Sequence, residues 1–304
     1  MGPDSSFTLP SAARPGRVAL RVNSLARVVP FYREVVDLDR SREGNQVRLG
    51  AGRTALLELG EAPDASERTP KEAGLFQVAV RYPDRAALAE CLARIEASEY
   101  ELTGASDHNV SESLYLRDPA GNGVELYRDR PRKEWPRTDD GRIDIDTRPL
   151  DLDELSAIAS TAEEERTNGD ETDLPDEGLG LADARAPAEA TIGHVHLEAT
   201  DLDRTEKFYI KGLGLGVQAR YGDRAAFLAT GEYHHHLGLN TWNDRSERPR
   251  GGEGLAWFGF VLPDSGTLDQ VIERLTDRGH AVERRDDRAF VTDPDGAHLR
   301  LSTD

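Results

Sequence analysis

RVALRVNSLARVVPFYREVVDL (residues 17–38) returns later in the chain as HVHLEATDLDRTEKFYIKGLGL (residues 194–215). The Phe-Tyr pair aligns in the two copies, as Phe31–Tyr32 and Phe208–Tyr209, and so do the surrounding apolar positions. Each copy predicts a strand with alternating apolar residues, followed by a helix whose apolar residues recur three and four positions apart. A repeat on this scale indicates that the chain is built from modules.

A second pair of repeats lies downstream of the first. QVAVRYPDRAALAECLARI (77–95) matches WFGFVLPDSGTLDQVIERL (257–275). The closing segments LYLRDPAGNGVELY (114–127) and AFVTDPDGAHLRLS (289–302) share an Asp-Pro turn followed by glycine, which suits a connection between strands. The sequence therefore predicts an α+β fold of four βαβββ modules, which we name A, B, A′ and B′ in chain order.

The modules divide the 304 residues into four parts. The predicted organisation is an N-terminal tail (1–16), a first module pair (17–130, with A at 17–62 and B at 74–130), an acidic linker (131–190) and a second module pair (191–304, with A′ at 191–245 and B′ at 254–304). The linker is rich in Asp, Glu, Pro and Gly, with one short helical pattern, DLDELSAIAS. We expect most of it to be solvated, with a lid over a site as the alternative.

The chain is acidic, with 57 Asp and Glu against 38 Lys and Arg and a formal net charge of −19. Few of the basic residues are lysines, and such acidic, arginine-rich surfaces resemble those of proteins from salt-loving organisms. This charge disfavours nucleic acid and anionic membranes as partners. The single cysteine, Cys91, excludes an intrachain disulfide, and neither a membrane span nor a signal-peptide core is evident. These features predict a cytoplasmic protein.

Five of the eight histidines lie between residues 194 and 236. His194 and His196 are two apart in one alternating segment, and His234 and His236 are two apart in another, so each pair is expected to share a strand face. His235 is then expected to point away. Neutral imidazole is a common ligand for Fe, Zn, Cu and Ni, so the cluster indicates either a metal site or a polar strand end.

Three segments in this order carry a family resemblance: SDHNVSESLYLRDPAGNGVELYRDRP (106–131), GHVHLEATDL (193–202) and EYHHHLGLNTW (232–242). With the tandem modules, they resemble the vicinal oxygen chelate superfamily of glyoxalases and type I extradiol ring-cleaving dioxygenases. The similarity is greatest to the four-module catechol-2,3-dioxygenase group. The resemblance implies a glyoxalase/bleomycin-resistance/dihydroxybiphenyl dioxygenase-like fold, with paired modules that form two curved, open-barrel sheets. It also implies Fe(II), or sometimes Mn(II), a catechol-like substrate and O2.

In this family the metal is held by two histidines and one carboxylate, from the first strands of two paired modules and the last strand of one. The positions that match are His194 in A′, Gln77 in B and Glu125 in B. Modules A and B′ carry Arg17, Trp257 and Arg300 at the corresponding positions. None of these three is a plausible ligand, which favours the pairing of B with A′ around the metal and of A with B′ as a structural partner.

Catalytic residues are implied by the same resemblance. His236 matches the family's acid/base histidine, and His234 is expected to share its face. Tyr115 lies ten residues before Glu125, the spacing of the family's substrate-orienting tyrosine, although a core aromatic is the alternative. His108 is a weaker candidate for the rim of the pocket.

Gln77 departs from the family pattern, which has histidine there. A glutamine carbonyl is a poorer ligand than imidazole for a transition metal. Three outcomes stay open. The metal binds more weakly through His194, Glu125 and Gln77, or His196 or His234 substitutes by a local rearrangement, or the chain has kept the fold without the activity.

The sequence thus predicts an enzyme, an extradiol ring-cleaving dioxygenase of the catechol-2,3-dioxygenase type. The alternatives are another metal-dependent reaction of the same scaffold, such as a glyoxalase-like isomerisation or thiol transfer, and a non-catalytic binding or resistance protein. Fold alone does not separate these functions. Whether the chain forms a homo-oligomer is left open.

Overall fold

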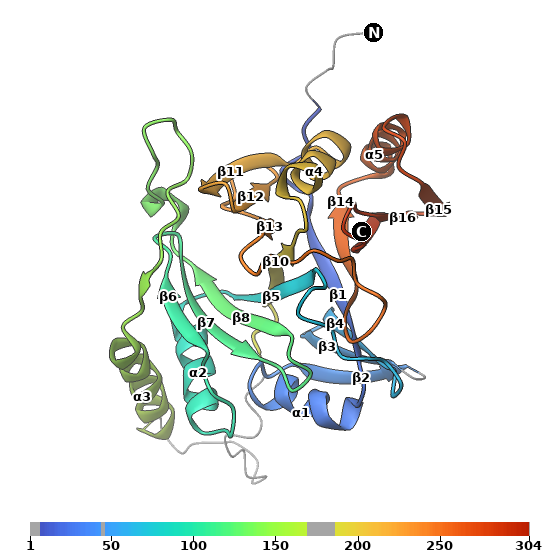
Figure 1. The fold of residues 1–304 in the computed structure, drawn as a ribbon. Coiled ribbons are helices and arrows are strands. Elements are labelled where there is room, and N and C mark those ends of the chain that lie inside the picture. The colour runs from blue at the N-terminus through green and yellow to red at the C-terminus, as the bar shows by residue number, and fades with distance from the viewer. Residues whose placement is uncertain (1–6, 44–45, 169–185, 304) are drawn as a thin grey trace.

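The structure is a computed structural model that describes residues 7–43, 46–168 and 186–303. Its strands form two large curved sheets, with the helices packed outside them (Figure 1). The helices are α1 (Leu25–Glu34), α2 (Arg85–Glu96), α3 (Leu152–Asn168), α4 (Leu202–Lys207) and α5 (Ser265–Asp277), with a 3-10 turn, η1 (Arg132–Glu134), and a π-helical turn, η3 (Phe208–Leu213).

One sheet has nine strands and joins module B to module A′. Its order is β11 (Gly216–Tyr221), β12 (Ala225–Ala229), β13 (Leu237–Asn240), β10 (Thr191–Glu198), β5 (Gly74–Tyr82), β8 (Gly123–Asp129), β7 (Ser111–Arg117), β6 (Gly104–Asp107) and β9 (Arg148–Pro149). The first strands of the two modules, β10 and β5, pair antiparallel at its centre.

The other sheet has eight strands and joins A to B′. Its order is β15 (Val282–Arg285), β16 (Arg288–Thr292), β17 (His298–Thr303), β14 (Gly254–Leu262), β1 (Arg14–Val22), β4 (Thr54–Glu61), β3 (Gln46–Ala51) and β2 (Asp39–Glu43). The predicted fold class and the pairing of B with A′ are both confirmed. β1 begins before the predicted start of module A, so the end of the expected tail belongs to this strand.

Local sequence explains where the module helices begin. Asp84, Asp201 and Asp264 precede α2, α4 and α5, and each aspartate accepts a hydrogen bond from the backbone N–H three residues later. A capping carboxylate satisfies one of the free N–H groups of the first turn and complements the helix dipole. The repeated position of this aspartate therefore fixes the strand-to-helix corner in three modules.

Two buried tyrosine–aspartate pairs link modules that are adjacent in sequence but lie in different sheets. Tyr32, from α1 of module A, donates to Asp118 in the Asp-Pro turn of module B at 3.0 Å. Tyr209, from η3 of A′, donates to Asp293 in the matching turn of B′ at 2.8 Å. The Phe-Tyr repeat and the Asp-Pro repeat thus meet in space, and each pair ties one sheet to the other.

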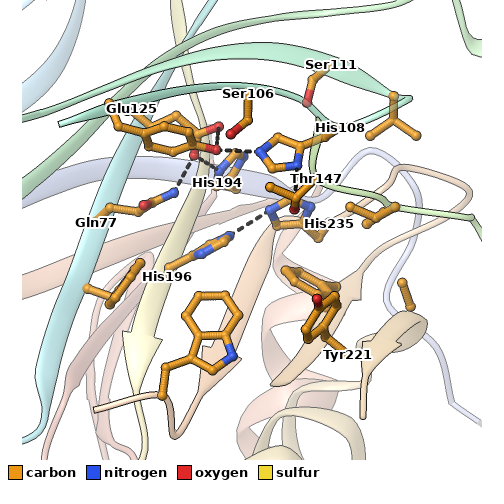
Figure 2. Close-up of a pocket in the computed structure, with 18 of the residues that line it drawn as sticks. Gln77, Ser106, His108, Ser111, Glu125, Thr147, His194, His196, Tyr221 and His235 are labelled. Carbon is orange, nitrogen blue, oxygen red and sulfur yellow. Dashed lines mark hydrogen bonds and ion pairs between the residues drawn. The ribbon is translucent and has the colours of Figure 1, made fainter. Parts of the chain in front are cut away.

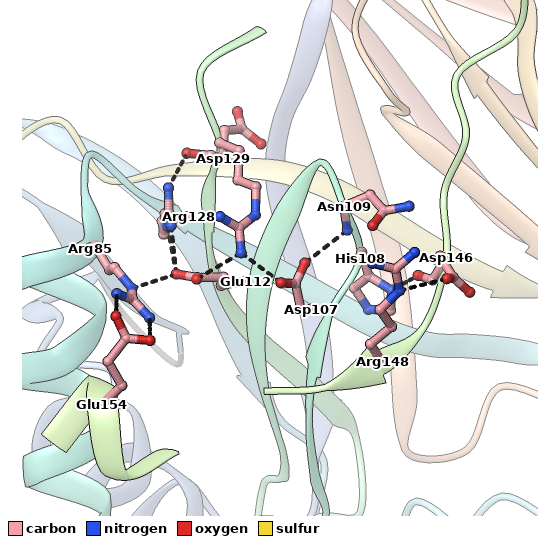
Figure 3. A network of polar contacts seen from close by, with 11 residues as sticks. Arg85, Asp107, His108, Asn109, Glu112, Arg128, Asp129, Asp146, Arg148 and Glu154 are labelled. Atoms are coloured by element: carbon pink, nitrogen blue, oxygen red, sulfur yellow. Dashed lines mark hydrogen bonds and ion pairs between the residues drawn. The ribbon is translucent and has the colours of Figure 1, made fainter. Parts of the chain in front are cut away.

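The described part of the predicted solvated linker is ordered as far as residue 168, and its residues 169–185 lie outside the described residues. Helix α3 packs beside α2 (Figure 1), and its Leu155 is fully buried. Buried Glu112 of β7 accepts hydrogen bonds from Arg85 of α2, from Arg128 of β8 and from Arg130, while Arg85 also pairs with Glu154 of α3 (Figure 3). This carboxylate therefore anchors the beginning of the segment to module B.

None of the helices in the described ranges has both the length and the apolar content of a membrane-spanning segment. Apolar side chains from both sheets and from the helices around them join in one large core. The concave face of each sheet is left open, and both faces carry polar residues.

Candidate metal centre and substrate pocket

The concave face of the nine-stranded sheet encloses a cavity of about 750 Å³. This volume lies in the range of small-molecule sites. Its walls include His194, His196, His235, Glu125 and Tyr115, together with aromatic side chains (Figure 2). Part of the wall also comes from the predicted linker, between residues 138 and 147. That part of the linker therefore forms part of the cavity wall, and the alternative of a lid over a site stays a prediction.

Strand register brings the three predicted ligand positions together. His194 on β10 lies opposite Ala79 on β5, and Ala79 pairs in turn with Glu125 on β8. The Nε2 atom of His194 is 2.7 Å from Oε2 of Glu125. The side-chain amide of Gln77 donates to the same Oε2 atom (Figure 2). Residues 48 and 69 positions away from Glu125 in the chain thus meet on one carboxylate.

Charge and burial leave this group of side chains ready to bind a cation. Burial acts to raise the pKa of Glu125, but the His194 imidazole lowers it to about 2. Burial, with the neighbouring His194, lowers the pKa of His196 to about 3, and burial lowers the pKa of His235 well below its usual range. At neutral pH the carboxylate is therefore ionised, and the imidazoles of His196 and His235 are neutral, the form that binds metals.

His196 points into the cavity because the strand beside it carries a glycine. Gly238 on β13, the last strand of module A′, pairs with His196. It therefore occupies in A′ the position that Glu125 occupies on β8 of module B, where Glu125 pairs with Ala79. A Cβ atom at Gly238 would lie 2.6 Å from Nε2 and 2.7 Å from Cγ of His196. The imidazole therefore occupies the space that a last-strand side chain of module A′ would otherwise take.

A third imidazole completes the group. His196 Nε2 lies 2.8 Å from His235 Nε2, and His194, His196 and His235 each offer a ring nitrogen within 4.8 Å of the others. Two ligands held about 2.1 Å from one ion lie roughly 3.0–3.4 Å apart. His196 and His235 are closer than that, at hydrogen-bond distance.

Residues 234–236 do not follow the predicted alternation. Strand β13 begins only at Leu237, so the three histidines lie in an irregular segment without a fixed strand face. His235 lines the cavity, whereas His236 lines a second cavity and packs against Tyr233, with ring centroids 4.7 Å apart. The prediction that His235 points away from the site was wrong, because alternation requires a regular strand.

His234 lies behind His235 and is fully buried. Its Nδ1 atom is 2.7 Å from Nδ1 of His235, and its Nε2 atom is 2.8 Å from Oδ1 of Asp129. Burial acts to raise the pKa of Asp129, but its hydrogen bond with His234 lowers it. An ionised carboxylate only accepts, so His234 donates through Nε2–H and accepts from Nδ1–H of His235. This arrangement leaves the lone pair of His235 on Nε2, toward the cavity.

Tyr115 and His108 form a second polar pair on the cavity wall. The Tyr115 hydroxyl is 2.5 Å from Nε2 of His108 and 3.4 Å from Oε1 of Glu125. The carbonyl of Asp146 lies 2.6 Å from Nδ1 of His108 and can only accept, so Nδ1 carries a proton, and the Tyr115 hydroxyl donates to Glu125. Burial raises the pKa of Tyr115 well above its usual range, so its hydroxyl keeps its proton.

The donor set fits a divalent transition metal. Nδ1 of His194 is buried and has no hydrogen-bond partner, and a buried polar atom in that state is costly. Neutral imidazoles beside one ionised carboxylate are the ligands that Fe, Mn and Zn sites use. His235 is the candidate site residue that sequence reasoning missed, and a role for the linker was only an alternative interpretation. The His run was the only signal for His235.

Comparisons with known proteins identify the family of the chain. The model of the Glyoxalase/Bleomycin resistance protein/Dioxygenase superfamily matches residues 14–126 and 191–301. Catechol-2,3-dioxygenase of Bacillus subtilis (strain 168) is 35% identical over 291 residues, which cover 93% of this chain and 95% of that protein. Sequence similarity therefore extends over both sheets.

Two solved structures share the fold. A putative dioxygenase from Bacillus subtilis superposes with a TM-score of 0.63 at 14% identity, over 98% of this chain and 86% of that one. Glyoxalase I from Zea mays superposes with a TM-score of 0.57 at 18% identity, over 96% and 92% of the two chains. The chain therefore belongs to the Glyoxalase/Bleomycin resistance protein/Dioxygenase superfamily and is a homologue of catechol-2,3-dioxygenase.

Proposed function

We propose that the protein is a metal-dependent extradiol dioxygenase that opens a catechol-type ring with O2. One observation carries the proposal: a buried, ionised carboxylate and three imidazoles converge in a cavity large enough for a small aromatic substrate. The 35% identical catechol-2,3-dioxygenase supports it. When bound, Fe(II), or alternatively Mn(II), would supply open coordination positions for the two ring oxygens and O2.

The ligands that we propose are His194, His196 and Glu125. His194 and Glu125 occupy the positions implied by the resemblance, and His196 supplies the imidazole that position 77 lacks. Gln77 acts on the carboxylate instead, because its amide donates to Glu125 and fixes the orientation of that group. Outer partners of this kind commonly change metal affinity about 10- to 100-fold.

His235 is the proposed acid/base residue, in place of His236. Asp129 and His234 hold its Nδ1 proton and leave a lone pair on Nε2. In the structure that lone pair faces Nε2 of His196 at 2.8 Å. Once Nε2 of His196 is a ligand, it has no proton to donate, and His235 Nε2 is free to accept a proton from a substrate hydroxyl.

The remaining wall fits a flat ring. Phe76, Phe227 and Trp242 give the cavity an apolar, aromatic surface opposite the polar groups. Tyr115, held by His108, presents its hydroxyl beside Glu125 and positions a ring oxygen. The pocket therefore combines an apolar surface with a few convergent polar groups, as is typical of a small-molecule site.

We also propose that the protein works in the cytoplasm, as its single cysteine supports, and in a salt-loving organism, as its acidic, lysine-poor composition supports. Its net charge of −19 opposes binding to nucleic acid or to an anionic membrane.

Anaerobic reconstitution tests the proposed activity. The protein is loaded with Fe(II), its metal content is measured, and O2 uptake and the ring-opened product are followed with catechol. We expect about one metal ion per chain with product formation, and loss of both on Glu125→Gln. Glu58→Gln is the matched control, because Glu58 on β4 occupies the corresponding register position in the other sheet. Bound Ni or Zn without ring opening would favour an isomerase-like reaction, and absence of metal would favour a binding protein.

A further inference from the structure

The concave face of the eight-stranded sheet contains a second cavity, of about 520 Å³. Six arginines contribute to its lining: Arg14, Arg17, Arg53, Arg81, Arg288 and Arg300. Among the residues that the structure describes, no aspartate or glutamate lines it. In a chain with a net charge of −19, this concentration of positive charge needs an explanation.

Register shows that this cavity is the counterpart of the proposed metal centre. Ala19 on β1 pairs with Glu58 on β4 and with Trp257 on β14. Gly259 on β14 pairs with Arg300 on β17. The position that Glu125 occupies in the nine-stranded sheet is therefore occupied here by Glu58 in module A and by Arg300 in module B′. The position of Gln77 is occupied by Trp257 in module B′. The concave geometry is kept and one carboxylate, Glu58, remains, but the other corresponding positions carry cationic and aromatic side chains.

Three of these arginines lie beside a carboxylate in the described residues. Glu58 pairs with Arg17 at 2.8 Å, Asp129 lies 3.4 Å from Arg81, and Asp287 lies 3.6 Å from Arg288. For Arg300 no carboxylate partner is found in the described part of the chain. Its guanidinium instead lies over two rings, with its central carbon 5.1 Å from the Trp257 centroid and 5.8 Å from that of Phe290.

Arg300 is under electrostatic stress as a result. Burial, together with the positive charges of Arg288 and Arg17, lowers its pKa from the usual value. Arginine does not lose its proton in proteins, so the guanidinium stays charged and an anion bound beside it would lower its electrostatic energy. His236 adds a neutral donor at the same cavity, because its Nδ1 accepts from the Thr230 N–H at 3.2 Å and its proton therefore lies on Nε2.

We propose that this cavity binds a small planar organic anion through its carboxylate group. Arg17 and Arg300 offer guanidinium groups, whose fork matches a carboxylate in two parallel hydrogen bonds. The Trp257 face, already stacked with Arg300, provides a flat surface for the rest of the molecule. The volume suits a molecule of the size of an aromatic acid. The site is separate from the proposed metal centre and does not depend on its activity.

Calorimetric titration of the purified full-length protein tests this site. The probes are benzoate and phthalate, with inorganic phosphate as a tetrahedral anion and benzamide as a neutral ring of the same shape. We expect saturable binding of phthalate, weaker binding of benzoate and none of benzamide. Added salt is expected to weaken the binding, because guanidinium–anion attraction is screened.

Charge-matched variants locate the binding. Arg300→Gln is expected to weaken phthalate binding at least tenfold. Arg53 is exposed at the rim of the cavity and is not part of the core, and Arg53→Gln is expected to weaken phthalate binding measurably. Arg33→Gln removes the same charge from the exposed face of α1 and is expected to leave binding unchanged. The proposal is overturned if no carboxylate saturates the protein at about 10 mM, if phosphate alone binds, or if binding survives both cavity variants.

Discussion

Replacing Gly238 with alanine tests whether His196 holds the metal. The new Cβ atom would come closest to Cδ2 of His196 and would lie 2.6 Å from its Nε2, whereas ordinary contacts begin at 3.4 Å, so the ring must retreat by at least about 0.8 Å. His196 is buried between His235 and Phe227, with ring centroids 4.9 and 5.8 Å away, and has little room to turn. Metal–ligand distances tolerate only about 0.2 Å.

We therefore expect Gly238→Ala to weaken Mn(II) binding about 10- to 100-fold, the scale seen when a ligand loses its orientation. Overpacking is also expected to lower the free energy of unfolding by about 1–3 kcal/mol. Binding is measured by anaerobic calorimetry, with Mn(II) as a probe that resists oxidation, and stability by urea unfolding. Gly216→Ala in β11 is the matched control, because its Cβ would meet its nearest atom at 3.6 Å, an ordinary contact.

A folded Gly238→Ala protein that binds Mn(II) as tightly as the wild type would refute the reasoning. A second variant protects the conclusion from indirect effects. His196→Gln removes the imidazole without adding volume at position 238 and is expected to weaken Mn(II) binding at least as much. If only the alanine variant loses affinity, the cause is distortion of the sheet, and His196 is not a ligand.

Three further predictions follow from other contacts. Gln77→Leu removes the amide that orients Glu125, so Mn(II) affinity is expected to fall about tenfold, whereas unchanged affinity would show that the amide is dispensable. Glu112→Gln breaks a buried ionic cluster, and urea unfolding is expected to show a loss of about 3–5 kcal/mol; a loss below 1 kcal/mol would contradict that cost. Burial raises the pKa of Asp293 to about 6 from 3.8, so the stability it contributes is present below pH 4 and is lost as pH rises through 6. Between pH 4 and 7 the free energy of unfolding of Asp293→Asn is therefore expected to rise by about 3 kcal/mol relative to that of the wild type. If the free energies of unfolding of the two proteins depend on pH in parallel, the effect is excluded.

The repeats in the sequence were sufficient to predict the modular fold. The Phe-Tyr and Asp-Pro repeats mark the same corners in corresponding modules, because strand alternation, helix periodicity and turn residues are local properties. With the family resemblance, the same offsets pointed to His194 and Glu125, and the structure places the two side chains within hydrogen-bond distance. The offsets also predicted the B–A′ pairing, because Arg17, Trp257 and Arg300 in modules A and B′ are not plausible ligands.

The tertiary structure decided which other side chains reach the site. His235 faces the cavity because residues 234–236 lie outside a regular strand, where period-two alternation gives no information. His196 reaches it because Gly238, from a different strand, leaves room for the imidazole. The arginine cavity also needs several strands to be brought together before its charge becomes apparent. The sequence alone determined the modules, since these depend on local periodicity, and its family resemblance implied two of the proposed ligands. Close approach between strands is set by packing and register, so the rest of both sites was decided only in the folded protein.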